Sequence, residues 1–364
     1  MNIAFFTDSY RPNVDGVVKC IELTKAELER KGHKVYVFAP SPDMEARVDR
    51  EVYYFESHPF LPYPQYRIAM VQDATLGINK LVKICRELRI DAVHSHGIAF
   101  TSIAAYRVAR RLGIPKFITF HTNVAGATHY ISKFRIVEKG FESVAWHYLK
   151  WLYSKYDRVL APSQRAADML GMHGIRSTVF PNGIELGKYL KVKRAPNRRG
   201  FMLLHVGRVV KEKRIDIAME MIRGRKDVSL HVIGGGPGLE HYRRLAKDMG
   251  IEDRVHLLGY VGHEKLNRFY RRANALIFCS PFDTQGLVVI EALASGMPVI
   301  AMAGTSGAEI AKDVDPRLVF SDQEGFDGAI SHAKKASARR CREVSRGYDV
   351  REQVRRLVGI YRGI

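Results

Sequence analysis

Residues Phe278–Ala301 read Phe-Cys-Ser-Pro-Phe-Asp-Thr-Gln-Gly-Leu-Val-Val-Ile-Glu-Ala-Leu-Ala-Ser-Gly-Met-Pro-Val-Ile-Ala, and this stretch decides the fold. The apolar run Ala275–Cys279 predicts a buried strand, and a polar loop follows it. A helix is expected to begin at Gly286 and a second strand at Pro298. Apolar strands separated by helices indicate a parallel sheet with both faces covered.

The same stretch places two carboxylates around a potential anion site. Backbone amides at a helix start have no carbonyl partner, so those of Leu287 and Val288 can bind a diphosphate. Asp283 lies in the preceding loop. Glu291 lies three or four residues further along the same helix face, where it can accept hydrogen bonds from sugar hydroxyls. This arrangement predicts a nucleotide-sugar site.

The alternation of strand and helix occurs twice along the chain. It predicts two doubly wound, Rossmann-like α/β domains, residues 1–181 and 182–348, which face each other across a cleft at the strand carboxyl ends. Pro181-Asn-Gly183 and a basic run mark the boundary. Residues 349–364 are expected to form a helix that crosses back to the first domain. The expected strands are Asn2–Phe6, Lys34–Ala39, Ala92–His94, Lys116–Phe120, Arg158–Ala161, Thr178–Phe180, Met202–Val206, Ser229–Ile233, Val255–Leu258, Ala275–Cys279 and Pro298–Ala301.

The composition excludes some classes of protein but does not identify the function. The chain has 364 residues, with 58 Lys and Arg against 38 Asp and Glu, for a net charge of +20. Such a field attracts nucleotides, nucleic acid or acidic lipids. The four cysteines show neither metal spacing nor a disulfide framework. No run approaches the roughly 18 apolar residues of a membrane span, and the start shows no signal peptide. A cytoplasmic setting is expected.

Two loops of the first domain are candidates for ligand contact. Gly16 precedes a helix, where backbone can approach a phosphate closely, although an ordinary turn would look the same. His121 follows a strand and is expected to face the cleft, where it can bond a sugar hydroxyl. A structural role for this histidine stays open, as it does for His94 and His96.

Two loops of the second domain carry the phosphate chemistry. Arg208 and Lys213 follow a strand and can clamp a diphosphate through charge-assisted hydrogen bonds; a solvated basic run is the alternative. Ile233-Gly-Gly-Gly-Pro-Gly238 is glycine-rich but matches no phosphate-loop pattern. We interpret it as close backbone packing beside the nucleotide, with Gly235 and Gly236 at the contact.

Taken together, these residues resemble glycosyltransferase family 4, whose members have the GT-B fold and retain the anomeric configuration. The likeness covers nearly the whole chain. It depends most on the pair Asp283 and Glu291, which is similar to the family pattern of Glu, seven residues, Glu. The other matching segments are Asp15-Gly16-Val17, His121-Thr122, Pro181–Ile184, Gly207–Lys213 and Gly234–Gly238.

The resemblance implies roles for individual residues. Glu291 would hold the nucleotide ribose, and Tyr260 and Val261 would contact the base. The implied catalytic residues are His121, Asp283, Arg208 and Lys213. The implied donor-binding residues are Gly16, Arg208, Lys213, Gly235, Tyr260, Val261, Asp283, Gly286, Leu287, Val288 and Glu291.

Three positions depart from the family pattern. Asp283 is one methylene shorter than the expected glutamate, which shifts its contact with the donor sugar. Asp15 stands where a glycine pair is common, and Arg214 replaces a glycine.

The resemblance implies a retaining, metal-independent hexosyltransferase. It would move a sugar from a UDP- or GDP-sugar to a hydroxyl acceptor, and no other cofactor is expected. Cations and helix amides would stabilise the charge on the leaving diphosphate. Two alternatives are a nucleotide-sugar 2-epimerase of the same fold and a basic nucleic-acid-binding protein, although no nucleic-acid module is recognisable.

Residues Ser132–Lys155 mix aromatic residues with lysines. Phe134, Phe141, Trp146 and Trp151 on a basic helix suit an anionic membrane face. A domain-packing helix with snorkelling lysines is the alternative. On the first interpretation the acceptor is a lipid or lipid-linked sugar, used at the inner membrane face by a peripheral enzyme of glycolipid biosynthesis.

Overall fold

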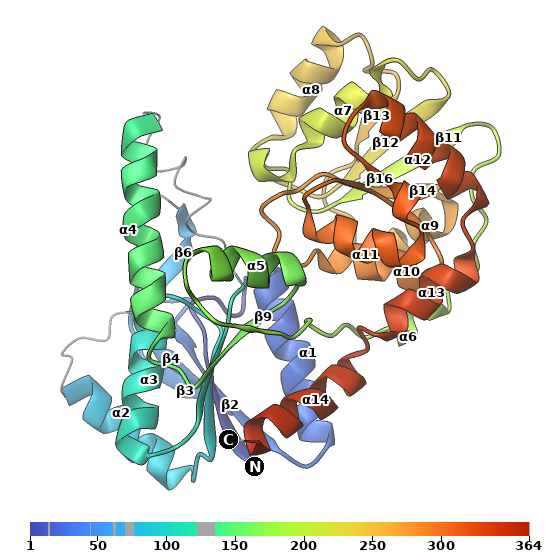
Figure 1. Ribbon diagram of the computed structural model, residues 1–364. Coiled ribbons are helices and arrows are strands. Elements are labelled where there is room, and N and C mark those ends of the chain that lie inside the picture. Colours follow the sequence, from blue (N-terminus) through green and yellow to red (C-terminus); the bar gives the residue numbers. More distant parts are fainter. Residues whose placement is uncertain (14, 44, 61–62, 70–75, 122–134, 364) are drawn as a thin grey trace. The chain divides into compact units, whose positions relative to one another are not determined.

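The computed structural model describes residues 1–364 except 14, 44, 61–62, 70–75, 122–134 and 364 (Figure 1). It divides into two compact units: unit 1 comprises Met1–Gly183 with Val350–Ile364, and unit 2 comprises Ile184–Asp349. Each unit contains a predominantly parallel sheet with helices, which confirms the predicted α/β class.

The main sheet of unit 1 has the strand order β10-β9-β8-β7-β1-β2-β4-β3. All neighbours are parallel except β3 and β4, which form an antiparallel edge. The strands are β1 (Asn2–Phe6), β2 (Lys34–Pro40), β3 (Arg47–Asp49), β4 (Val52–Phe55), β7 (Ala92–Ser95), β8 (Lys116–Thr119), β9 (Arg158–Ala161) and β10 (Thr178–Val179).

Both faces of this sheet are covered, as side chains of β1 show. Ile3 and Phe5 pack in a core with α1 (Gly16–Arg30) and α14 (Val350–Arg362), whereas Ala4 and Phe6 pack in another with α2 (Leu76–Glu87) and α3 (Phe100–Leu112). Alternate side chains of a strand point to opposite faces, so an apolar strand needs helices on both. The remaining helices are α4 (Arg135–Tyr153) and α5 (Gln164–Met172).

A separate antiparallel ribbon of unit 1, β5 (Ser57–Phe60) with β6 (Tyr63–Ala69), was not expected from the sequence. Its prolines, Pro59 and Pro64, cannot donate hydrogen bonds to a neighbouring strand. The sequence pattern therefore predicts a loop where the structure has these two strands.

The sheet of unit 2 is parallel throughout, in the order β13-β12-β11-β14-β15-β16. Its strands are β11 (Phe201–Val206), β12 (Val228–Ile233), β13 (Val255–Leu257), β14 (Ala275–Phe278), β15 (Val299–Met302) and β16 (Val319–Phe320). Its α-helices are α6 (Gly187–Leu190), α7 (Ile215–Arg223), α8 (Leu239–Asp248), α9 (His263–Arg272), α10 (Leu287–Ala294), α11 (Ser306–Val314), α12 (Gln323–Lys335) and α13 (Ala338–Arg346).

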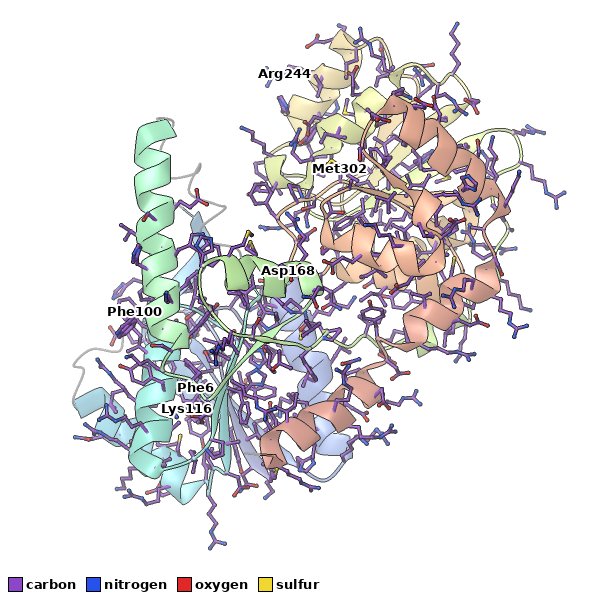
Figure 2. All side chains as sticks on the ribbon, in the orientation of Figure 1. Phe6, Phe100, Lys116, Asp168, Arg244 and Met302 are labelled. Atoms are coloured by element: carbon purple, nitrogen blue, oxygen red, sulfur yellow. The ribbon has the colours of Figure 1, made fainter. Side chains whose placement is uncertain are left out.

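Two side chains labelled in Figure 2 illustrate the interior and the surface of the units. Phe6 of unit 1 is fully buried, whereas Arg244 of unit 2 is exposed. All four cysteines are buried and free. Within the described part of the chain, no helix combines the length and apolarity needed to span a membrane.

The last helix, α14, belongs to the core of unit 1 although it follows unit 2 in the chain. Val354, Leu357 and Tyr361 are buried there against residues of β1 and α1. Gly183 lies so close to α14 that a Cβ at this position would be 2.5 Å from the Cα of Val350. The glycine of the Pro181-Asn-Gly183 segment is therefore required by packing.

Candidate functional site

Most of the predicted donor-binding residues gather at the carboxyl edge of the unit 2 sheet. β11 is paired with β12 on one side and β14 on the other, so the loops after these three strands are neighbours. They carry Arg208 and Lys213, the glycine-rich turn, and Asp283 with Gly286.

The glycine-rich turn packs against the backbone of Gly207–Val209. A Cβ at Gly234 would lie 1.8 Å from the Gly207 carbonyl oxygen, and one at Gly236 would lie 2.4 Å from that of Val209. The Val209 amide donates to the Gly235 carbonyl over 2.8 Å. By contrast, no atom lies within 4 Å of a Cβ placed at Gly235. Packing explains Gly234 and Gly236, and a donor contact at Gly235 stays a prediction.

Lys213 and Asp283, predicted for different parts of the donor, form an ion pair in this structure. The ammonium contacts both carboxylate oxygens, at 2.6 and 2.7 Å. Their side chains are only 20% and 26% exposed. A ligand phosphate that binds Lys213 must therefore share or replace this carboxylate, and Asp283 is linked to the phosphate position through the lysine.

His205, near the end of β11, is a site neighbour that the sequence interpretation missed. It is buried, and its Nε2 has no hydrogen-bond partner within the described part of the chain. Burial, with a smaller contribution from the Lys213 charge, lowers the pKa of His205 to about 4. The available signal was a histidine in the otherwise apolar strand Phe201–Val206, which Gly207 follows.

The first backbone amides of α10 are without partners in the helix, as the sequence predicted. Gly286 adopts a left-handed conformation, φ 78°, and a Cβ there would lie 2.9 Å from the Phe278 ring. Among the residues that the structure describes, no side chain caps this helix, and its first turn contains no acidic residue. The amides of Leu287 and Val288 have no carbonyl partner within the helix, so this end favours an anion.

Glu291 is buried, only 3% exposed, and its carboxylate is held by tyrosines that the sequence interpretation missed. The Tyr270 hydroxyl donates to Oε2 over 2.8 Å, and Tyr189 of α6 also hydrogen-bonds this carboxylate. Burial and the negative charge of Glu291 raise the pKa of both phenols. Little carboxylate surface is left for a ribose, and its orientation is fixed.

Arg208, Tyr260 and Val261 complete the predicted set in unit 2. Arg208 is exposed and Val261 is partly buried. Tyr260 is 81% exposed, unusual for an aromatic side chain. It follows Gly259, whose carbonyl accepts from the Gly234 amide at 2.8 Å. The predicted base-contacting segment is thereby fixed beside the glycine-rich turn.

In unit 1, His121 ends a run of three stacked histidine rings with His96 and His94. Its Nε2 lies 3.0 Å from Nδ1 of His96. The ring centroids of His96 and His121 are 5.2 Å apart, and those of His94 and His96 are 4.2 Å apart. Burial lowers the pKa of His121 to about 4. Thr122, its neighbour in the family-like motif, lies outside the described residues.

Gly16, where the sequence predicts the close approach of a phosphate, is the first residue of α1 and follows a capping carboxylate. The carboxylate of Asp15 accepts hydrogen bonds from the amides of Val17 and Val18, both at 2.9 Å, and caps α1. These two amides are therefore satisfied within the protein, and a phosphate contact through the Gly16 backbone stays a prediction. This departure from the glycine pair of the family pattern is thus a helix cap.

Asp8 is another residue that the sequence interpretation missed. One carboxylate oxygen accepts from the amides of Ile98 and Ala99, at 2.6 and 2.8 Å. A Cβ at Gly97 would lie 2.2 Å from that oxygen. Asp8 therefore fixes the loop that follows His96.

The aromatic residues of α4 separate into two environments, which corrects their grouping on one membrane-facing surface. Trp146 is buried and stacks on His173 with centroids 3.7 Å apart. Trp151 is 42% exposed, with the Lys155 ammonium 5.6 Å from its ring centroid. Phe134 and the side chain of Phe141 lie outside what the structure describes.

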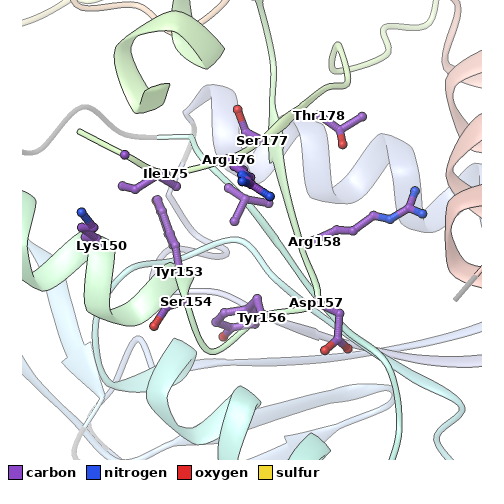
Figure 3. A pocket seen from close by; sticks show the side chains of 12 residues that line it. Lys150, Tyr153, Ser154, Tyr156, Asp157, Arg158, Ile175, Arg176, Ser177 and Thr178 are labelled. Atoms are coloured by element: carbon purple, nitrogen blue, oxygen red, sulfur yellow. The ribbon is translucent and has the colours of Figure 1, made fainter. Parts of the chain in front are cut away.

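A cavity of about 370 Å³ in unit 1 contains none of the predicted site residues (Figure 3). It is lined at the amino ends of β9 and β10, whereas His121 follows the carboxyl end of β8. Lys150, Arg158 and Arg176 contribute positive charge to its lining. The carboxyl end of α4 contributes a partial negative charge there, which opposes anion binding.

No cluster of three or more histidine, cysteine, aspartate or glutamate side chains with metal-binding geometry occurs among the residues that the structure describes. Metal independence remains an expectation. It is based on the positive charge of Lys213 and on the uncapped start of α10.

Comparison with known proteins places the two units in related families. Residues 14–188 match the family described as Glycosyltransferase Family 4, and residues 190–346 match Glycosyl transferases group 1. An alpha-monoglucosyldiacylglycerol synthase of Streptococcus pneumoniae is 29% identical over 352 residues, covering 92% of this chain and 78% of that protein. A GDP-mannose-dependent alpha-mannosyltransferase of Corynebacterium glutamicum is 25% identical, covering 82% and 72%.

Solved structures share the fold. The Anabaena protein HepE, crystallised with UDP, has a TM-score of 0.70 and 15% identity over 100% of both chains. The lipopolysaccharide outer core galactosyltransferase WaaB has a TM-score of 0.73 and 17% identity over 98% of this chain and 99% of that one. With the family matches to both units, these similarities establish that the chain belongs to glycosyltransferase family 4 and is a glycosyltransferase of the GT-B fold.

Proposed function

We propose that the protein transfers a hexose from a UDP- or GDP-sugar to a hydroxyl of a lipid or lipid-linked glycan, with retention at the anomeric carbon. The observation that carries this proposal is the convergence of Lys213, Asp283 and the uncapped start of α10 at one sheet edge in unit 2. A cation and helix amides beside each other suit a diphosphate, and the adjacent carboxylate suits sugar hydroxyls.

In this mechanism the bond between the anomeric carbon and the diphosphate oxygen breaks. Negative charge develops on the leaving diphosphate, where Lys213, Arg208 and the amides of α10 stabilise it. The acceptor oxygen bonds to the anomeric carbon, and the acceptor proton passes to a leaving phosphate oxygen. When Lys213 turns to the diphosphate, Asp283 is released from its ion pair to bind donor-sugar hydroxyls. No covalent nucleophile from the protein is required.

A lipid acceptor is favoured by the relatives and by the surface of unit 1. Alpha-monoglucosyldiacylglycerol synthases of two organisms, Streptococcus pneumoniae and Acholeplasma laidlawii, are similar over 92% of this chain. Trp151 and Val144 of α4 are exposed, at 42% and 66%, and Lys155 lies against Trp151. Exposed aromatic and basic groups together suit the surface of an anionic membrane. The enzyme would act in the cytoplasm, bound peripherally to the inner membrane face.

One relative is named as a monoglucosyldiacylglycerol synthase and another as a mannosyltransferase, which favours transfer over the 2-epimerase and nucleic-acid-binding alternatives. The proposal is tested by incubating the protein with labelled UDP-glucose, UDP-galactose or GDP-mannose and dispersed diacylglycerol, without added metal. A labelled α-linked glycolipid from one donor is expected. A β-linked product, an epimerised donor, or transfer only to water-soluble sugars would contradict it.

A thermal-shift screen of the same donors identifies the base, because stabilisation follows affinity. The productive donor is expected to raise the Tm of the wild type and to lose this effect in Glu291→Ala.

A further inference from the structure

The cavity of unit 1 in Figure 3 lies where three segments meet. The end of α4 contributes Lys150 to its lining, the start of β9 contributes Arg158, and the segment before β10 contributes Arg176. Its volume of about 370 Å³ is near the lower limit of the roughly 300–1,000 Å³ that small-molecule sites occupy. This size suits a small ligand or the head group of a larger one.

The three cations of the lining have no acidic partner. Among the residues that the structure describes, no side-chain ion pair or hydrogen bond is made by Lys150, Arg158 or Arg176. Unpaired cations are expected in a chain with 58 basic and 38 acidic residues. Three that share one cavity repel one another there, however, and a bound anion would offset this repulsion.

The lining itself does not supply this negative charge. Asp157 is the one acidic residue among the described residues of the lining. Its Oδ1 accepts a hydrogen bond from the Lys116 ammonium at 2.7 Å, and its Oδ2 accepts from the Lys116 amide at 2.9 Å. Lys116, which does not line the cavity, therefore neutralises Asp157, and the charge of the three lining cations remains.

Strand pairing places two of the cations at the same level. β9 and β10 are parallel, with Leu160 opposite Thr178. Arg158 and Arg176 each lie two residues before these partners in the chain, so the same register, continued by two residues, sets them level with each other. Like charges at matched positions of neighbouring strands are destabilising, and a bound anion would remove this cost.

The ammonium of the third cation, Lys150, lies against a glycine. A Cβ at Gly174 would be 3.0 Å from this ammonium, and Gly174 has φ 71°. A larger residue there would therefore displace the ammonium and strain the backbone. Figure 3 shows Arg176 between Lys150 and Arg158, so the positive charge is spread along the cavity.

The negative partial charge at the carboxyl end of α4 is smaller than the charge of these cations. A helix end carries a partial charge of about half an elementary charge. Lys150 lies in the last turn of α4, where a cation interacts favourably with that partial charge. The full positive charges of Arg158 and Arg176 then remain in the lining, so the balance favours an anion.

We propose that this cavity is a second anion site, separate from the donor site proposed in unit 2, and that it binds a phosphate group. Arg158 and Arg176 bind the phosphate oxygens through their planar guanidinium groups, and Lys150 binds them as a point charge. The phosphate belongs to a small phosphorylated molecule or to the head group of a lipid, since both present the same oxygens. The site requires no contact with unit 2 and does not depend on the proposed transfer reaction.

Calorimetric titration with inorganic diphosphate tests the proposal for a free ligand. The background is Lys213→Met, because this substitution removes the ammonium from the proposed donor site. Arg158→Gln with Arg176→Gln is expected to weaken binding at least about tenfold, since two charge-assisted hydrogen-bonding groups are lost. Arg86→Gln with Arg110→Gln removes the same charge from exposed positions outside the cavity. At about 0.1 M salt this control pair should change the affinity by less than about twofold, because remote charges are screened.

Vesicles that contain phosphatidic acid test the lipid head group. Here the background is Trp151→Ala with Lys155→Ala, which removes the membrane contact proposed for α4. Sedimentation that falls in the Arg158 and Arg176 variant, and not in the control pair, would identify a lipid head group as the source of the phosphate. Lys150→Gln provides an independent variant, with an expected loss of about fivefold in the same assay. Equal effects of the two arginine pairs in both experiments would overturn the proposal.

Discussion

Tyr270 donates a hydrogen bond to Oε2 of Glu291 over 2.8 Å, in an interior where Glu291 is only 3% exposed. The two residues come from different helices, α9 and α10, and Tyr189 of α6 binds the same carboxylate. A buried carboxylate is stable only if such partners satisfy it. The orientation of the Glu291 carboxylate, which we propose binds the donor, is therefore set by tyrosines outside the recognisable motif.

Tyr270→Phe is expected to lower the free energy of unfolding by about 1–3 kcal/mol, because a buried acceptor loses its donor. The donor KM should rise several-fold as the carboxylate reorients. Urea unfolding and steady-state kinetics measure the two effects. Tyr348→Phe removes a hydroxyl elsewhere in unit 2 and should leave KM unchanged. If Tyr270→Phe binds the donor normally, Tyr270 does not orient Glu291.

The ion pair of Lys213 and Asp283 predicts different results for stability and for activity. Lys213→Met leaves a carboxylate unpaired and should cost about 1 kcal/mol of stability, and it should reduce kcat/KM about 100-fold through loss of charge stabilisation. Adding Asp283→Asn should restore most of the stability and none of the activity. Recovery of activity in the double variant would show that Lys213 serves only to neutralise Asp283.

Adjacent glycines of the β12 turn provide a matched test of packing against ligand contact. Gly234→Ala would place a Cβ 1.8 Å from a carbonyl oxygen, at φ 141°, so the variant should be severely destabilised. Gly235→Ala meets no atom within 4 Å and should have a wild-type Tm. If Gly235 contacts the donor, its variant alone combines normal stability with an increased donor KM.

The buried histidines predict that the protein loses stability as the pH falls. His94, with a pKa of about 3 in the folded state, is protonated in the unfolded chain below about pH 6.5. The unfolded state then binds more protons, so stability falls by up to about 1.4 kcal/mol per pH unit for this group. Denaturant unfolding at pH 7 and pH 5 should show a smaller pH effect in His94→Gln than in the wild type. His241→Gln, at an exposed site, should leave the pH effect unchanged.

The membrane proposal predicts that exposed residues of α4 and of the segment after it contribute to vesicle binding, whereas buried residues of α4 do not. Trp151→Ala combined with Lys155→Ala should weaken sedimentation with vesicles of anionic lipid about tenfold or more at low salt, since an aromatic anchor and a cation are lost. Met172→Ala, at a 78% exposed apolar position, is the control. Wild-type protein that stays in solution with these vesicles would exclude the surface as a membrane contact.

The sequence predicted the elements whose signal is local. β1 and β9 have the expected bounds, and the other expected strands differ by one or two residues at their ends, because strands buried on both faces are continuous apolar runs. The β5–β6 ribbon was missed because its prolines argue against strands. The strands β3, β4 and β16 were also missed, because each has only two to four residues.

The sequence predicted those site residues that lie within one recognisable motif. Gly286 and Glu291 could be placed on one helix from spacing alone. The contacts Lys213–Asp283, Tyr270–Glu291 and His96–His121 join elements 70, 21 and 25 residues apart in the chain. Such pairs depend on strand order and helix packing, which no local pattern specifies. The cap that the Asp15 side chain forms on the amides of Val17 and Val18 was also not predicted from the sequence.

The position of α14 also sets an order for protein synthesis. The core of unit 1 needs Val354, Leu357 and Tyr361, which leave the ribosome only after all of unit 2. Unit 2 is one continuous segment and can fold as it emerges from the ribosome. Residues 1–183 are synthesised earlier, but the apolar face that α14 covers stays exposed until α14 has been made. A released chain that ends before residue 350 would contain all of unit 2 but leave the apolar face of unit 1 uncovered, and it would be a natural substrate for chaperones.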